Sequence, residues 1–385
     1  MKKILALALA MIMVLSLAAC GGGTTASQTP SGEPTDAAVE TTEPTTDPAE
    51  DTETPVGDNT YEVALVTDVG NIDDKSFNEG TWNGVVEYCT DNNMTYNYYR
   101  PSEDSTEARV EAIGNAVSRG AKVVVCPGYM FAETLSTVQE QYPEVMFLGI
   151  DVTEGDMETV TENTALITYQ EEQAGYLAGY AAVKDGFTKL GFLGGMAVPA
   201  VIRYGYGFVQ GADAAAVELG VDVQINYWYG NTFGPSDDVK IKMDGWFTGG
   251  TEVVFACGGG IYLSALQAAQ EAGAYVIGVD VDQSAEDEII ISSAMKDLAE
   301  STIVALTALY ENDGVWPADY AGKGNVLGAA EGSVGLPVGD SWRFKTYTVE
   351  EYEELFAEMV AGNIEISDSI DAAPTTTKVV ADYQG

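Results

Sequence analysis

From Tyr61 onward, short apolar runs alternate with stretches in which apolar residues recur every three or four positions. The runs are rich in β-branched and aromatic residues and predict buried strands, whereas the stretches between them predict helices. In the first half of the chain this pattern predicts strands at 62–67, 93–99, 122–126 and 146–150, and helices at 77–90, 106–119 and 132–141.

The same alternation restarts after a helix of small residues at 171–183, which we expect to pack closely against a sheet. It predicts strands at 189–193, 222–229, 253–256, 275–279 and 288–292, and helices at 198–219, 237–248, 263–272 and 299–311. Repeated strand–helix units form parallel sheets with right-handed crossovers. Two such series in one chain predict an α/β protein with two doubly wound lobes.

The N-terminus has the pattern of an export signal. Two lysines precede an apolar run from Ile4 to Leu17, and small residues follow before Cys20. The placement of Cys20 resembles the lipobox of bacterial lipoproteins, which implies removal of residues 1–19 and a lipid on the Cys20 sulfur. The alternative is an ordinary signal peptide with a chance cysteine.

Residues 20–60 have a different composition from the rest of the chain. After Cys20 this segment holds nine acidic residues, five prolines and eleven threonines, and no lysine or arginine. It has too few apolar side chains to offset the entropy of ordering. We therefore expect a disordered acidic tether, and a ligand-binding domain at 61–385.

Charge and cysteine usage exclude several classes of function. The formal net charge is −43 and the chain contains no histidine. Such a polyanion is a poor partner for nucleic acid or an anionic membrane surface. Without histidine it lacks the usual general base and neutral metal ligand, so we expect no metal and no cofactor. Cys89, Cys126 and Cys257 lie in apolar surroundings and are expected to be small buried residues.

Acidic residues, glycines and aromatics recur where predicted strands end. They follow the strands at Thr67, Cys126, Ile150 and Val279, and also occupy the loops 230–233 and 258–260. Ligands of parallel α/β sheets bind at the carboxyl ends of strands. Turn residues are common at strand ends for local reasons as well, so the joint pattern carries more weight than any single loop.

One of these loops supports a family assignment. The segment Thr67-Asp-Val-Gly-Asn-Ile-Asp-Asp-Lys-Ser-Phe-Asn78 resembles the PnrA-like, or basic membrane protein, family of bacterial lipoproteins. Further similar segments are Gly278-Val-Asp-Val-Asp-Gln283, Ser292-Ser-Ala-Met-Lys296 and Gly328-Ala-Ala-Glu-Gly-Ser-Val-Gly-Leu336. The resemblance runs from about Tyr61 to about Val338. Asn71 departs from the family, which usually has a second glycine there; we expect Gly70 and Asn71 to turn the chain, with Asn71 able to adopt a left-handed backbone.

The resemblance implies a type I periplasmic-binding fold with a ligand cleft between the lobes. The first lobe is expected at about 61–166 plus 294–325, and the second at about 167–293 plus 326–375. It also implies a substrate-binding protein of an ABC importer for purine nucleosides. Such a protein would be a monomer, lipid-anchored through Cys20 on the extracytoplasmic face of the cell membrane, with an ABC permease as its partner.

The resemblance also implies roles for individual residues. Phe77 and Phe233 would stack on the two faces of the base. Asp68, Asn78 and Asp151 would meet polar edges of the base or sugar. Asp280 and Lys296 would hold the ribose hydroxyls, with the backbone at Gly258 close by.

Local roles compete with these at several positions. Phe77 could be a core anchor, Asn78 a helix cap and Asp68 a turn residue. The second stacking ring could instead be Trp228 or Tyr229. Asp73 and Asp74 are expected only to turn the chain and start a helix.

Other functions fit the same pattern. The fold could bind a sugar, a free nucleobase or another small metabolite, or act as a ligand sensor. An enzyme is disfavoured, since the chain lacks histidine and a Gly-x-Ser-x-Gly motif. Asp280 and Asp282 could form a pair of catalytic acids, but we expect their side chains to point in opposite directions.

Overall fold

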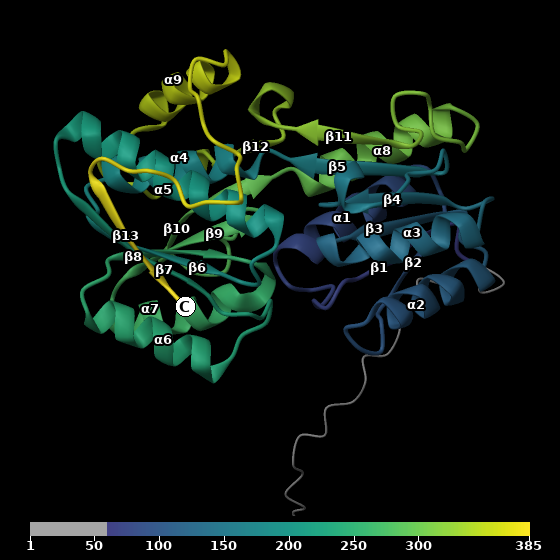
Figure 1. Cartoon of the computed structure of the whole chain (residues 1–385), viewed down its shortest axis with the longest axis horizontal. Helices are drawn as coiled ribbons and strands as arrows, with labels where there is room; N and C mark the ends of the chain where they lie inside the picture. The colour runs from purple at the N-terminus through teal and green to yellow at the C-terminus, as the bar shows by residue number, and fades with distance from the viewer. Residues whose placement is uncertain (1–59) are drawn as a thin grey trace, which may run out of the picture. The chain divides into compact units, whose positions relative to one another are not determined.

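The computed structural model describes residues 60–385 and arranges them around two β-sheets (Figure 1). In the first sheet the strand order is β11-β5-β4-β3-β1-β2, and all neighbouring pairs are parallel. Its strands are β1 (Val63–Val66), β2 (Tyr96–Tyr99), β3 (Val123–Pro127), β4 (Met146–Ile150), β5 (Thr164–Tyr169) and β11 (Lys323–Leu327). Helices α1 (Phe77–Asp91), α2 (Thr106–Ser118) and α3 (Ala132–Gln141) cover it, and α8 (Leu298–Glu311) packs against α1.

The second sheet has the strand order β12-β10-β9-β8-β6-β7-β13 and is parallel except where β12 meets β10. Its strands are β6 (Lys189–Gly194), β7 (Val223–Tyr229), β8 (Val253–Cys257), β9 (Tyr275–Asp280), β10 (Ile290–Lys296), β12 (Val334–Gly335) and β13 (Val379–Gln384). The helices of this lobe are α4 (Glu171–Lys184), α5 (Pro199–Leu219), α6 (Asp237–Thr248), α7 (Tyr262–Ala272) and α9 (Val349–Val360). Short 3₁₀ turns are η1 (Tyr129–Phe131), η2 (Glu154–Asp156), η3 (Gly259–Ile261), η4 (Ala329–Glu331) and η5 (Gly339–Ser341).

The chain passes between the two sheets at three places within the described residues. It leaves the first sheet after β5, returns after β10 and leaves again between β11 and β12. The prediction of an α/β fold with two doubly wound, mainly parallel lobes is therefore confirmed. Residues 1–59, which include the predicted signal, Cys20 and nearly all of the predicted tether, lie outside the described range.

Both sheets are buried on two faces, as parallel sheets usually are. Every residue of β1, β3, β5 and β8 is buried. Cys89, Cys126 and Cys257 are buried and form no disulfide, which confirms the prediction that they are small buried residues. Within residues 60–385, no helix combines the length and the apolar composition needed to cross a membrane.

The small-residue helix predicted at 171–183 corresponds to α4, whose closest contacts are with another helix rather than with the sheet. A Cβ on Gly175 would lie 2.1 Å from the carbonyl oxygen of Tyr204, and one on Gly211 would lie 1.9 Å from that of Tyr176. Gly179 and Gly207 make similar approaches. These glycines let α4 and α5 pack backbone to backbone, which fixes the start of α5 beside the inter-lobe cleft.

Candidate functional site

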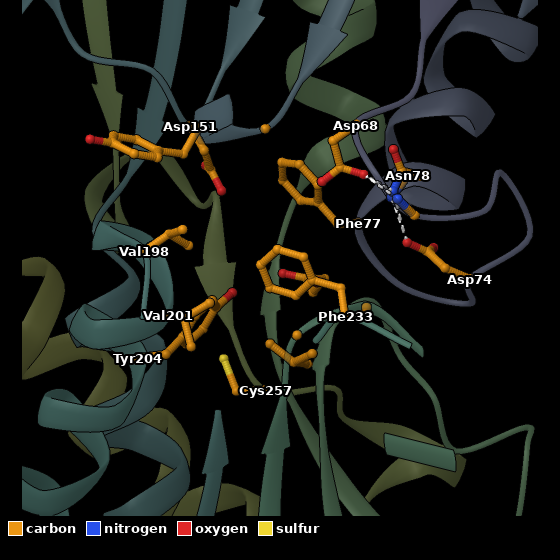
Figure 2. Close-up of a pocket in the computed structure, with 18 of the residues that line it drawn as sticks. Asp68, Asp74, Phe77, Asn78, Asp151, Val198, Val201, Tyr204, Phe233 and Cys257 are labelled. Carbon is orange, nitrogen blue, oxygen red and sulfur yellow. Dashed lines mark hydrogen bonds between the residues drawn. The ribbon is translucent and has the colours of Figure 1, made fainter. Parts of the chain in front are cut away.

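A cavity lies between the two lobes, at the carboxyl ends of strands from both sheets (Figure 2). Its free space, including the solvent at its open mouth, is about 610 Å³. All eight predicted ligand-binding residues line it: Asp68, Phe77, Asn78, Asp151, Phe233, Gly258, Asp280 and Lys296. The topology therefore brings together residues that are more than 200 positions apart in the sequence.

The loop after β1 forms one wall of this cavity. Asp68 accepts a hydrogen bond from the Gly70 backbone N–H at 2.7 Å, as an Asx turn does. The chain bends at Gly70, as expected, but Asn71 does not adopt the left-handed backbone that it tolerates. The left-handed residue is Lys75, with φ of 54°. Its backbone N–H and its ammonium both bond Glu79, at 3.0 Å each, which stabilises this conformation.

Asp74 starts helix α1, as predicted, and it also lines the cavity. Its carboxylate accepts hydrogen bonds from the backbone N–H groups of Ser76, Asn78 and Glu79 at 2.9 to 3.1 Å. These are donors that a helix start otherwise leaves unpaired. The predicted local role is therefore confirmed, but the sequence did not indicate that the same carboxylate would face the cleft.

The side-chain amide of Asn78 is held in one orientation by two carboxylates. Its Nδ2 donates to Asp68 Oδ1 and to Asp74 Oδ2, both at 3.1 Å (Figure 2). The reverse orientation would bring the amide oxygen against two carboxylate oxygens, so Nδ2 must point that way. Asn78 Oδ1 is left buried without a hydrogen-bond partner in the described structure. It is an acceptor that a ligand donor could satisfy.

Lys296 ends β10 at the crossing between the lobes and is only 3 % exposed. Its ammonium lies 2.6 Å from Asp151 Oδ2, 3.4 Å from Glu171 Oε1 and 3.9 Å from Asp280 Oδ1. Glu171 is in turn bonded by Arg203 Nε at 2.7 Å. The cluster thus holds three carboxylates against two cations, and Asp151 Oδ1 remains buried without a partner.

Asp151 and Asp280 share an unusual backbone conformation. Asp151 directly follows β4 of the first sheet and Asp280 ends β9 of the second, with φ of 62° and 66°, in the left-handed region. Non-glycine residues rarely adopt it, and such strain concentrates at functional sites. Asp280 Oδ2 also accepts a 2.5 Å hydrogen bond from Ser76 Oγ of the other lobe. Both carboxylates are thereby aimed at the cleft.

Burial dominates the electrostatics of these groups. It raises the pKa of Asp280 to about 6, against the opposing effects of Lys296 and Ser76. It raises the pKa of Asp151 to about 7, although Lys296 pulls the other way. Burial alone would lower the pKa of Lys296, but Asp151, Glu171 and Asp280 together raise it above its ordinary value. Lys296 therefore stays charged at neutral pH.

Two phenylalanine rings lie on opposite sides of the cavity, Phe77 from the first lobe and Phe233 from the second (Figure 2). Both are partly buried and also pack against the core. A Cβ on Gly195 would lie 2.5 Å from the Phe233 ring, and one on Gly258 would lie 3.1 Å away. These two glycines make the space in which the ring sits.

The alternative second rings lie elsewhere. Trp228 packs with the core between α6 and the sheet, under the Lys242 ammonium. Tyr229 contacts the rings of Phe192 and Tyr227, and its hydroxyl bonds that of Tyr227 at 2.8 Å. Neither lines the cavity. Asp282 points away from the cavity, as we expected, and accepts a hydrogen bond from Ser341. The reason is that β9 ends at Asp280, so Asp282 lies in the loop that follows and not on the strand.

Sequence reasoning missed several residues of this site. Glu171 and Arg203 were overlooked because each lies in a helix whose other residues read as packing positions. Tyr204 and Val201 line the cavity from the start of α5, where they look like one face of an amphipathic helix. Cys257 was expected to be buried, and it is, but it also borders the cavity.

Comparison with known proteins identifies the family. The family model described as "ABC transporter substrate-binding protein PnrA-like" matches residues 61–369. Basic membrane protein B of Borreliella burgdorferi is 27 % identical over 288 residues, covering 73 % of this chain and 82 % of that protein. A Lactococcus lactis protein named "ABC transporter nucleoside-binding protein BmpA" is 28 % identical over 261 residues. The match covers 64 % of this chain and 70 % of that protein.

Solved structures support the same fold. An ABC transporter solute-binding protein from Aeropyrum pernix K1 superposes with a TM-score of 0.69 at 22 % identity, over 81 % of this chain and 94 % of the other. An ABC transporter solute-binding protein from Conexibacter woesei superposes with a TM-score of 0.63 at 19 % identity, over 80 % of this chain and 99 % of the other. At these identities the likeness establishes the type I periplasmic-binding fold alone. The family consists of solute-binding proteins and not of enzymes. The family model and the similar proteins together show that the chain belongs to the PnrA-like family of ABC transporter substrate-binding proteins.

Proposed function

We propose that this protein captures purine nucleosides outside the cytoplasm and delivers them to an ABC permease, as a monomer anchored through a lipid on Cys20. Family membership supports delivery to a permease. The name of the Lactococcus lactis relative, a nucleoside-binding protein, supports the ligand class. The carrying observation is a cavity that combines aromatic rings from both lobes with buried acceptors that have no hydrogen-bond partner among residues 60–385.

The rings suit a purine base. A purine has two flat apolar faces, and stacking on an aromatic ring contributes roughly 1–3 kcal/mol per base. Phe77 and Phe233 would each cover one face. Phenylalanine brings no polar hydrogen that would have to be satisfied inside the cleft.

The polar groups suit the rim of a nucleoside. Asn78 Oδ1 lacks a donor, and an N–H of the base would supply one, with Asp68 beside it. Vicinal ribose hydroxyls can donate to carboxylates and accept from an ammonium. Asp280, Lys296 and Asp151 would hold them, and hydrogen bonds to charged groups contribute roughly 1.5–3 kcal/mol each. Backbone at Gly258, whose φ is 138°, can approach the ligand closely.

Asp280→Ala tests the ribose assignment. It should weaken binding of inosine by roughly 1.5–3 kcal/mol, because charge-assisted hydroxyl bonds are lost. It should affect 2′,3′-dideoxyinosine far less, since that ligand lacks both hydroxyls. Calorimetric titration of wild type and variant with each ligand gives the four values.

The matched control is Asp282→Ala, which removes a carboxylate two residues away whose hydrogen bonds point out of the cavity. It should leave both affinities unchanged. Equal losses for the two ligands with Asp280→Ala would mean that Asp280 shapes the lobe and does not contact the sugar.

The anchor is tested separately on the full chain. Wild-type protein expressed in a bacterial host should partition into the detergent phase, because the acyl chains of a lipid on Cys20 bury their CH₂ groups there. Cys20→Ser should release the protein from the membrane fraction. The proposal of a lipid anchor fails if the variant partitions like the wild type.

A further inference from the structure

The hydroxyl of Tyr204 is a polar group at the cavity that has no role in the binding mode proposed above. Val198, Val201 and Tyr204 follow one another at intervals of three residues at the start of α5, so they share the face that borders the cavity. Figure 2 shows Tyr204 with its hydroxyl directed toward the cavity. Tyr204 is 1 % exposed, and its Oη has no hydrogen-bond partner among residues 60–385.

Tyr169 provides a direct contrast. The rings of Tyr169 and Tyr204 both flank the Lys296 ammonium, at 5.2 and 5.8 Å from their centroids. The Tyr169 hydroxyl is satisfied by Ser301 Oγ at 2.5 Å. The Tyr204 hydroxyl has no equivalent, and a buried hydroxyl without a partner is unfavourable. A phenylalanine would fill the same space without that cost. Because Tyr204 also lines the cavity, a bound ligand can supply the partner that the described part of the chain does not.

The surroundings of Tyr204 define what this partner must offer. Burial, followed by the nearby Asp280 and Glu171 carboxylates, raises the pKa of Tyr204 well above its ordinary value. The hydroxyl therefore keeps its proton and can both donate and accept, whereas an ionised carboxylate can only accept. A ligand hydroxyl placed here can donate to a carboxylate and accept from Tyr204 at the same time.

Helix packing holds Tyr204 in place. Its main-chain carbonyl lies against Gly175 of α4, where an added Cβ would come within 2.1 Å. A polar group on a helix that is fixed by backbone contact is positioned more accurately than one on a loop. This rigidity suits a residue that discriminates between closely related ligands.

We infer that the Tyr204 hydroxyl hydrogen-bonds a sugar hydroxyl of the bound nucleoside and is a further specificity-determining residue of the site. The inference rests on the proposed function. The Tyr204 hydroxyl is a neutral group that can donate and accept, and it stands beside the charged groups of Asp280 and Lys296. We therefore expect one sugar hydroxyl of the ligand to need Tyr204 as a partner in addition to Asp280 or Lys296.

The test is a set of titrations with Tyr204→Phe, which keeps the ring and removes only the hydroxyl. Wild type and variant are titrated with inosine and with its 2′-, 3′- and 5′-deoxy forms. The variant should bind inosine roughly tenfold more weakly. With one of the three deoxy ligands, the variant and the wild type should bind equally, because that ligand lacks the hydroxyl that Tyr204 contacts.

Tyr347→Phe is the matched control. Tyr347 is 2 % exposed, and its hydroxyl also lacks a partner within the described structure, but it does not line the cavity. This variant should bind every ligand as the wild type does. Removing an unsatisfied hydroxyl should not destabilise either variant.

Two outcomes would overturn the inference: unchanged inosine affinity in Tyr204→Phe, or the same loss with inosine and all three deoxy ligands. Failure of the proposed function has a different signature. In that case the wild type itself would bind neither inosine nor any other purine nucleoside, before any variant is compared.

Discussion

At the scale of single residues, the cavity pairs apolar faces with fixed acceptors. Phe77 and Phe233 supply the faces, and Gly195 makes room for the Phe233 ring. Asn78 Oδ1 and Asp151 Oδ1 supply acceptors that have no hydrogen-bond partner in the described part of the chain. The other polar atom of each side chain, Asn78 Nδ2 or Asp151 Oδ2, is hydrogen-bonded to neighbouring residues and fixes the orientation of the acceptor. These side chains therefore need to move little when a ligand binds.

Removing either ring tests this pairing. Phe77→Ala and Phe233→Ala should each weaken nucleoside binding by roughly 1–3 kcal/mol, because one stacking face is lost. Trp228→Ala is the control, since that ring lies outside the cavity. Calorimetry with inosine measures all three. A loss with Trp228→Ala that matches the loss with Phe77→Ala, while Phe233→Ala binds normally, would contradict the arrangement.

Three of the eight residues that sequence reasoning placed in the cavity are also supported by a local pattern. Asp68, Asp151 and Asp280 directly follow or end predicted strands, and strand ends of parallel sheets meet at ligand sites. Tyr204 and Glu171 could not be found in this way. They lie inside helices, and their position depends on how α4 packs against α5, which is a tertiary contact that no local pattern specifies.

At the scale of elements, the α4–α5 pair positions that side of the site. Gly175 and Gly179 of α4 and Gly207 and Gly211 of α5 remove the side chains that would separate the helices. The close approach of the helices places the Glu171 carboxylate 2.7 Å from Arg203 Nε and 3.4 Å from Lys296 Nζ. The charge cluster around Lys296 therefore depends on glycines that do not contact it.

Gly175→Ala should lower the free energy of unfolding by about 1–3 kcal/mol, because its methyl group would overlap the Tyr204 carbonyl. Inosine affinity should fall as well, since Tyr204 would shift. Gly245→Ala in α6 is the control: its Cβ meets no atom within 4 Å, so it should raise stability by about 0.5–1 kcal/mol. Urea unfolding measures both. A Gly175→Ala protein as stable as Gly245→Ala would show that the helices are not in backbone contact.

Helices and strands with a clear periodicity of apolar residues could be predicted from the sequence. Strands that are defined mainly by their hydrogen bonds to neighbouring strands could not. Helices α3 and α6 begin and end at the predicted residues. Strand β5 was overlooked although Thr164–Tyr169 is largely apolar and fully buried. Strand β11 at a sheet edge has mostly exposed residues, and β12 has only two. Their assignment comes from hydrogen bonds to neighbouring strands, which sequence periodicity does not encode.

At the scale of the whole two-lobed domain, several contacts join the lobes beside the cavity. Ser76 bonds Asp280 at 2.5 Å, Gln283 Nε2 bonds the Lys75 carbonyl at 2.8 Å, and Lys296 pairs with Asp151. A ligand that contacts Phe77 on one lobe and Phe233 on the other would add to these contacts. It would bind the closed arrangement better than an open one, and only such a difference can shift that equilibrium.

The central claim is that the cleft binds a purine nucleoside, with both base and sugar contributing. Calorimetric titration of the wild-type protein with inosine, hypoxanthine and D-ribose tests it most directly. We expect saturable binding of inosine that is tighter than binding of either part alone, because the rings contact the base while the Asp280–Lys296 group contacts the sugar. Saturable heat with ribose, together with none for inosine, guanosine or adenosine, would contradict the claim.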